Sequence, residues 1–129
     1  MLQGAPSRGI FSIAVPSEGS LILVGGDYSQ PDTVRGNVAY SVDGRTFTAR
    51  SESGPRGYRS GIAIWSRGDR PAVAIAVGPT GSDITRDHGA HWVPFDSAGF
   101  HAVRASRDGI FYASGSDGRV ATFDARSPR

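Results

Sequence analysis

Short apolar runs recur along the chain, and each is bounded by turn-forming residues such as Gly, Asp and Asn. The clearest examples are Leu21–Gly25, Val73–Gly78 and Ile110–Gly115. Runs of this length, rich in Val, Ile, Phe and Tyr, are typical of β-strands. No segment combines a helical apolar period with helix-capping residues. The pattern therefore predicts an all-β chain.

The strands follow one another in a repeating order. Each repeat opens with Gly and continues with an apolar or aromatic strand, starting at Gly9, Gly57 and Gly99. A second strand that ends in Gly and then a third strand follow in every repeat. A fourth strand follows only in the first two, as Arg45–Ala49 and His91–Phe95.

Repeats of about 40–50 residues with four short strands are typical of β-propeller blades. The sequence predicts a β-propeller fragment of about three four-stranded blades in a single domain, residues 1–129. The blades are expected near residues 9–50, 57–96 and 99–125.

Two repeats carry a short polar motif between the third and fourth strands. The second has Thr85-Arg-Asp87-His-Gly89-Ala-His-Trp92, and the first has Ser41-Val-Asp43-Gly44-Arg-Thr-Phe47, which is one residue shorter. In such a turn Asp accepts backbone N–H bonds and Gly adopts a positive φ. We expect Asp43 and Asp87 in equivalent hairpin turns, with Phe47 and Trp92 mostly buried.

These motifs resemble the Asp-box (BNR-repeat) β-propellers, and in particular the bacterial group similar to photosystem II stability and assembly factors. The likeness is also carried by Val24–Tyr28, Gly57–Ser60, Ala76–Asp83 and Gly99–Val103. The resemblance implies a ring of six or seven blades, a ligand site at the central channel and a role as a binding scaffold.

An arc of three blades leaves apolar blade faces uncovered at its two ends. Self-association is the simplest remedy, and two-fold symmetry is the commonest oligomer symmetry. We therefore expect a homodimer that closes a ring of about six blades. The segment before Gly9 is a candidate for the missing fourth strand of the third blade.

Composition narrows the classes of function. Hydrophobic residues make up 38% of the chain and charged residues 20%, as in a folded domain. There is no cysteine and no lysine, which excludes thiol chemistry and a Schiff base. All fourteen basic residues are arginines, they are dispersed along the sequence, and the net charge of the chain is only +2. No nucleic-acid partner is therefore expected. No apolar stretch is long enough to predict a membrane partner, and the N-terminus lacks a signal-peptide pattern, which favours a cytoplasmic location.

Propeller geometry assigns several polar residues to one face of the channel. Asp27, Asp83 and Asp117 each follow the Gly that ends a second strand, and His101 aligns with Arg59 at the entry to the innermost strand. Oxygen-rich rings of this kind suit calcium, and a histidine there is suited to ligate zinc or to act as a general base. The predicted metal ligands of this divalent cation are Asp27, Asp83, Asp117 and His101.

The predicted catalytic set is His101, Asp83, Arg59 and Tyr58, with Arg59 binding an anionic group. Structural roles remain open for all of these residues. The aspartates are then turn caps, His101 a packing residue, Arg59 the partner of Asp27 or Asp83, and Tyr58 with Tyr28 a channel wall.

Two functions follow from these residues. The first is a binding scaffold, with a small-molecule ligand as one option. The alternative is a metal-dependent hydrolase of activated esters or phosphoesters, in which the metal polarises the substrate and lowers the pKa of bound water. A sialidase-like glycosidase is the least supported, because the only glutamates are Glu18 and Glu52.

Overall fold

The protein forms three separate antiparallel β-sheets in a computed structural model that describes residues 4–17, 19–49, 54–68 and 72–126. Glu18 and Glu52 lie outside the described residues. The first sheet has the order β1-β2-β3-β4, the second β5-β6-β7-β8, and the third β11-β10-β9. All-β architecture is thus confirmed.

Each sheet is built from the strands of one predicted repeat, although the predicted strand Arg45–Ala49 is reduced to Thr48–Ala49. The first sheet contains β1 (Arg8–Ala14), β2 (Leu21–Asp27), β3 (Val38–Ser41) and the short β4 (Thr48–Ala49). The second contains β5 (Gly61–Trp65), β6 (Val73–Gly78), β7 (Gly81–Thr85) and β8 (Val93–Asp96). The third contains β9 (Ala102–Ala105), β10 (Ile110–Ser114) and β11 (Val120–Asp124).

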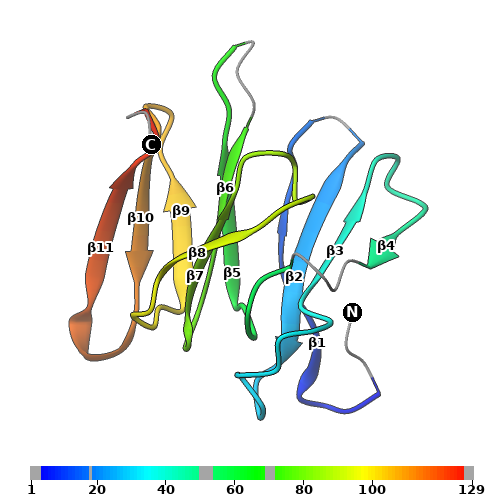
Figure 1. The fold of residues 1–129 in the computed structure, drawn as a ribbon. Coiled ribbons are helices and arrows are strands. Elements are labelled where there is room, and N and C mark those ends of the chain that lie inside the picture. The colour runs from blue at the N-terminus through cyan, green and yellow to red at the C-terminus, as the bar shows by residue number, and fades with distance from the viewer. Residues whose placement is uncertain (1–3, 18, 50–53, 69–71, 127–129) are drawn as a thin grey trace.

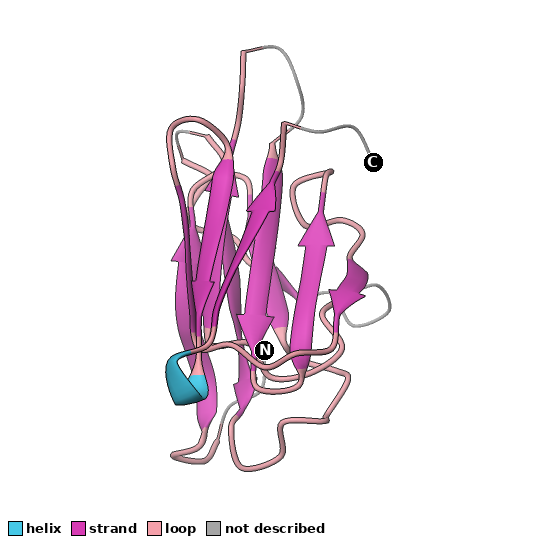
Figure 2. Ribbon diagram, turned by 90° about the vertical axis from the view of Figure 1, so that its left-hand side faces the viewer, coloured by secondary structure: helices cyan, strands magenta, loops and turns pink. Residues whose placement is uncertain are grey.

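The three sheets stand side by side like the blades of a propeller, and we call them blades 1, 2 and 3 in chain order (Figure 1). Neighbouring blades meet along their first strands, β1, β5 and β9. The strands share one general direction, so the turns gather at two ends (Figure 2). We call the end at the bottom of Figure 1 the entry end, because the chain enters the first strand of each blade there. The β2–β3, β6–β7 and β10–β11 connections lie at this end. The described residues include no helix of a length and apolarity that would cross a membrane.

Each pair of neighbouring blades encloses its own apolar core. Between blades 1 and 2 the buried residues are Ala14, Ile22, Val24, Val38, Ile62, Ala74, Ala76 and Trp92. Between blades 2 and 3 they are Val73, Ile75, Val77, Ile84, Phe100, Val103, Phe111 and Ala125. The strands of blade 2 contribute to both cores, which explains why β6 is apolar at successive positions.

A glycine closes the second strand of each blade at a point of very close backbone approach. A Cβ at Gly25 or Gly78 would overlap the carbonyl oxygen of Gly9 or Tyr58, and at Gly115 it would lie 2.9 Å from Gly99 O. The same glycines join the blades: Arg59 N–H donates to Gly25 O at 2.9 Å, and Phe100 N–H donates to Gly78 O at 2.9 Å. The repeated glycine therefore lets the first and second strands of one blade approach closely, and its carbonyl joins that blade to the next.

The two Ser/Thr-Asp motifs form equivalent turns at the end opposite the entry end. Asp43 Oδ1 accepts the backbone N–H groups of Arg45 and Thr46, both at 2.8 Å. Asp87 Oδ1 accepts the backbone N–H of His91 at 2.8 Å, and the Thr85 hydroxyl donates to the same carboxyl. The predicted structural role of both aspartates is confirmed.

The aromatic residues that follow these turns differ in burial. Trp92 is only 7% exposed, as predicted, because it packs in the core between blades 1 and 2. Phe47 is 50% exposed, so the prediction that it is mostly buried is wrong. Trp92 faces the preceding blade, whereas no described blade precedes blade 1. The contrast identifies an uncovered face on blade 1.

The Asp87 turn should contribute stability that depends on pH. Burial acts to raise the pKa of Asp87, but hydrogen bonds from the backbone and ring of His91 and from Thr85 outweigh it and lower the pKa. A carboxyl with a lowered pKa in the folded state stabilises above its ordinary pKa, and this contribution is lost as pH falls through the folded-state value.

We predict that Asp87→Ala lowers the free energy of unfolding at pH 7 by about 1–2 kcal/mol. The difference from wild type should shrink between pH 5 and pH 3 in urea titrations followed by circular dichroism. A difference that stays constant over this range would contradict an ionised Asp87 as the source of the stability.

Candidate functional site

Three aromatic rings form a cluster at the entry end, and we call Phe11, Tyr28 and Tyr58 the aromatic cluster. The Phe11 ring meets the Tyr58 ring edge-on at a centroid distance of 5.2 Å and the Tyr28 ring at 6.0 Å. Tyr28 and Tyr58 are 6.3 Å apart. Phe11 is 43% exposed and Tyr28 54%, whereas Tyr58 is buried beneath them. The cluster thus exposes the rings of Phe11 and Tyr28 to solvent, and the buried ring of Tyr58 supports both.

Local backbone features place each ring. The pairing of β1 with β2 shifts register between Ile10 and Ser12, which leaves Phe11 at a β-bulge. Bulges re-aim side chains and are common beside functional sites. Tyr28 N–H donates to Ser7 O at 3.0 Å, and Tyr58 N–H donates to Pro31 O at 3.0 Å, so both tyrosines are anchored by their backbone.

Tyr58 was predicted as a catalytic residue or a channel wall. Burial, and secondarily the neighbouring Tyr28 phenol, raise the pKa of Tyr58 above its ordinary value. Its hydroxyl therefore stays protonated at neutral pH, and it can donate a hydrogen bond without serving as a base. The structure gives Tyr58 the position of a wall that supports Phe11 and Tyr28.

Arg59 and Asp83 form an ion pair inside the protein. Arg59 Nε and Nη2 both lie 2.7 Å from Asp83 Oδ2, and the two side chains are 3% and 0% exposed. Arg59 Nη1 also donates to Tyr58 O and to the Thr80 hydroxyl, each at 3.0 Å. Asp83 Oδ1 is buried without a hydrogen-bond partner among the described residues. The pair ties the start of β5 to β7.

A second ion pair holds the neighbouring loop of blade 1. Arg8 Nε donates to Asp27 Oδ2 at 3.0 Å, and the Ser29 hydroxyl donates to Asp27 Oδ1 at 2.6 Å. Hydrogen bonds from Ser29, Ser7 and Arg8 hold the pKa of Asp27 well below its usual range. Asp27 is thus a charged, fully engaged turn residue at neutral pH.

A groove with charged side chains lies beside the loop that carries Tyr58, where Arg56 and Arg59 line it. It has a volume of about 420 Å³, and its lining includes Asp32, Arg56, Arg59, Thr80 and Asp96. Both signs of charge are present along it. A bound peptide would find hydrogen-bond donors and acceptors here beside an apolar anchor point.

The remaining predicted residues lie elsewhere at the entry end. His101 Nε2 is 3.0 Å from the Ser116 hydroxyl, and Asp117 sits exposed in the short 3₁₀ turn Ser116–Gly118, with φ 60°. The alignment of His101 with Arg59 is wrong by one residue. His101 N–H donates to Ser114 O as Ser60 N–H donates to Val77 O, so His101 corresponds to Ser60 and Phe100 to Arg59.

The three aspartates are also not equivalent in position. Asp27 and Asp117 follow Gly25 and Gly115 by two residues, where blade 2 has Thr80, and Asp83 lies within β7. Among the described residues, no three His, Asp or Glu side chains come close enough to hold a metal ion. The metal set Asp27, Asp83, Asp117 and His101 is thus not assembled within one chain, and its convergence around a closed ring stays a prediction.

Sequence reasoning identified Tyr28 and Tyr58 but missed Phe11. An apolar residue in a strand normally predicts burial, and only the register shift at Ile10–Ser12 turns Phe11 toward the tyrosines. β1 and β2 are consecutive strands, but the position of a bulge between them depends on their register, which the sequence of one strand does not show.

The buried ion pair gives a clear energetic prediction. Arg59→Met should destabilise the protein by about 3–5 kcal/mol, because it leaves the Asp83 carboxylate buried and unpaired. The double variant Arg59→Met/Asp83→Leu should recover much of that loss, since both charges are then absent. Urea unfolding of the wild type, the single variants Arg59→Met and Asp83→Leu and the double variant measures both effects, and additive losses in the double variant would contradict the coupling.

Comparisons with known proteins bear on the fold. No family model matches the sequence, and no curated protein matches it. Among solved structures, the chain is similar to "YCF48 bound to D1 peptide", a β-propeller, with a TM-score of 0.65 at 14% identity over 95% of this chain. The match spans 39% of the length of that neighbour. With its three sheets arranged as blades, this chain has a partial β-propeller fold.

Proposed function

We propose that the protein is a binding scaffold that holds a segment of a partner protein at its entry end. The observation that carries this proposal is the aromatic cluster, in which Phe11 and Tyr28 are exposed on the buried ring of Tyr58. Exposed aromatic side chains that are already ordered are typical centres of binding energy, because little conformational entropy is lost when they are covered.

The surroundings of the cluster favour a peptide over a small metabolite. The polar groove beside Tyr58 is open and carries Asp32, Arg56 and Asp96, which can pair with backbone amides and charged side chains of an extended chain. The loops on either side are fixed by the Arg8–Asp27 and Arg59–Asp83 pairs. The structural neighbour was solved with a bound peptide, which supports the same class of ligand.

The resemblance to Asp-box propellers belongs to this proposal. The equivalent hydrogen bonds of Asp43 and Asp87 support it, because both carboxylates cap a turn that joins the third and fourth strands of a blade. The hydrolase alternative has less support, since Asp83 is committed to Arg59 and Asp27 to Arg8.

We further propose that two copies close a ring of about six blades. Ile10, Ile13 and Phe47 are exposed on blade 1, and Tyr112 and Val120 are exposed on blade 3. Such apolar blade faces are normally covered by a neighbouring blade. In the described junctions, Gly25 O and Gly78 O accept N–H groups from the next blade.

Gly115 holds the same position in blade 3 that Gly25 and Gly78 hold in blades 1 and 2. Ile10 holds the same position in blade 1 that Arg59 holds in blade 2. A hydrogen bond from Ile10 N–H to Gly115 O of the second copy would therefore repeat the same junction. Closing the ring would place two aromatic clusters around one channel.

Peptide binding is predicted to depend on the exposed rings. Peptides selected from a displayed random library on the wild-type protein should bind Phe11→Ala and Tyr28→Ala about tenfold more weakly or worse, as measured by fluorescence anisotropy. The matched control is Val42→Ala, an exposed apolar residue at the opposite end that should leave binding unchanged. Selected peptides that bind both cluster variants normally would contradict the site.

Ring closure is predicted to appear as a mass of twice the 13.5 kDa chain in light scattering at low micromolar concentration. Ile13→Asp should shift the protein to monomers, because it places a carboxylate on the exposed face of blade 1. Val42→Asp is the control and should remain dimeric. A well-folded wild-type monomer at this concentration would overturn the proposed dimer.

A further inference from the structure

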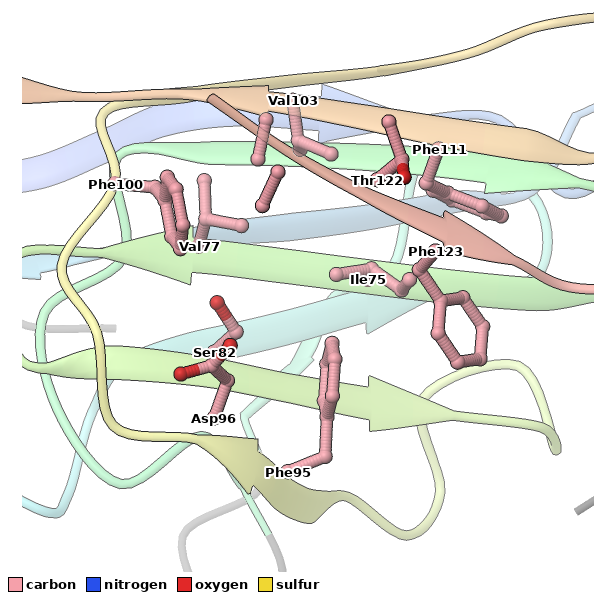
Figure 3. A pocket seen from close by; sticks show the side chains of 12 residues that line it. Ile75, Val77, Ser82, Phe95, Asp96, Phe100, Val103, Phe111, Thr122 and Phe123 are labelled. Atoms are coloured by element: carbon pink, nitrogen blue, oxygen red, sulfur yellow. The ribbon is translucent and has the colours of Figure 1, made fainter. Parts of the chain in front are cut away.

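A cleft lined mainly by apolar side chains opens between blades 2 and 3, and it shares Ser82, Phe95 and Asp96 with the groove beside Tyr58. It has a volume of about 230 Å³, and its lining includes Ile75 and Val77 from blade 2 and Val103, Phe111 and Ala113 from blade 3. Phe95 and Phe123 stand at its mouth with ring centroids 5.6 Å apart (Figure 3). An apolar cavity of this size can accommodate an aromatic ring.

The same molecule shows what occupies the corresponding place one blade earlier. Trp92, just before β8, belongs to the buried cluster between blades 1 and 2, together with Ala14, Ile22, Val24, Val38, Ile62, Ala74 and Ala76. The strand pairings show which residues of blades 2 and 3 stand in the same positions one blade later. For example, Val103 pairs with Ala113 in blade 3 as Ile62 pairs with Ala76 in blade 2. The corresponding residues are Ala63, Ile75, Val77, Ser82, Val103, Phe111 and Ala113, and all of them except Ala63 line the cleft.

The strand that would carry the corresponding aromatic residue lies beside the third strand of its blade. In blade 2, β8 pairs with β7, with Val93 opposite Ile84 and Pro94 opposite Asp83. In blade 3, β11 is the edge strand of its sheet in the described part of the chain. The cleft is therefore continuous with the blade 2–blade 3 interface and lies beside a strand edge that can pair with another extended segment.

We propose that β11 and this cleft form a second docking site, for an extended partner peptide with an aromatic side chain. The peptide pairs antiparallel with Val120–Thr122, and its aromatic side chain enters the cleft between Ile75 and Phe111, as Trp92 does one blade earlier. In blade 2, Trp92 is buried and the next residue, Val93, is the first of β8 to pair with β7. In the bound peptide, the aromatic residue likewise stands one position before the segment that pairs with β11.

The N-terminal segment of a second copy is a less suitable occupant. Its described residues are already bonded within blade 1, since Arg8 N–H donates to Ala5 O and Tyr28 N–H donates to Ser7 O, both at 3.0 Å. Those bonds would have to break before the segment could extend along β11. A separate partner peptide carries no such cost.

The test uses a synthetic peptide with the sequence of residues 90–98, Ala-His-Trp-Val-Pro-Phe-Asp-Ser-Ala, as the probe. It should bind the full-length wild-type chain saturably in calorimetry, and the same peptide with Ser in place of Trp should bind about tenfold more weakly or worse. Ala113→Trp, which fills the cleft, should weaken binding to a similar degree. Val42→Trp adds the same side chain at a distant exposed position and should bind the peptide normally.

Two N-methylated peptides keep the proposal testable even if Ala113→Trp fails to fold. One is methylated at His91 and Val93 and the other at Trp92, so each blocks amides along one edge of the strand before the register shift between Pro94 and Asp96. Antiparallel pairing uses only one of these edges, so one peptide should bind and the other should not.

Equal binding of both methylated peptides, or of the Trp and Ser peptides, would overturn the site. The proposal would also be overturned if the wild type bound no peptide and the Ala113→Trp variant lost the dimer. That result would identify a second copy of the chain as the occupant of the cleft. Tyr28→Ala should bind this peptide as the wild type does, which separates the outcome from that of the entry-end site.

Discussion

The architecture depends on the close backbone approach at the end of each second strand. At Gly25 and Gly78 a side chain would overlap the chain that enters the innermost strand, and the carbonyl of the same glycine accepts an N–H from the next blade. The close approach packs the first two strands of one blade together, and the hydrogen bond to the glycine carbonyl holds the next blade at a fixed distance. The two interblade cores, with Trp92 in one and Phe111 in the other, are consequences of this spacing.

The same junction brings the candidate site together. Arg59 follows Tyr58 and bonds through its N–H to Gly25 O, so the start of β5 is fixed against the end of β2. That placement brings Tyr58 under Phe11 and Tyr28, and it leaves the Arg59 side chain inside, where Asp83 neutralises it. Charged residues that the sequence suggested as chemical groups are thus used to hold the loops in place, and the exposed surface they support is aromatic.

Uncovered blade faces are the other consequence of a fold in which every blade relies on its neighbours. Trp92 is buried because blade 1 covers it, whereas Phe47 is exposed on blade 1 in the corresponding place. The cleft beside β11 follows from the same logic, since it matches the Trp92 position without an aromatic side chain from a described fourth strand. Two of the surfaces proposed for partners, the face of blade 1 and the cleft beside β11, are therefore blade surfaces without a neighbour in the described part of the chain.

The sequence by itself determined the all-β fold, the repeat of blades and the two turn aspartates. These features rest on contacts between residues close in the chain: alternation within a strand, Asp87 bonding to the backbone of His91, and a glycine at each strand end. Only the tertiary structure decided the pairing of Arg59 with Asp83, the turning of Phe11 at its bulge and the correspondence of His101 with Ser60. Each of these depends on the register with which separate segments pair in the fold, and a shift of one residue there changes which side chains meet.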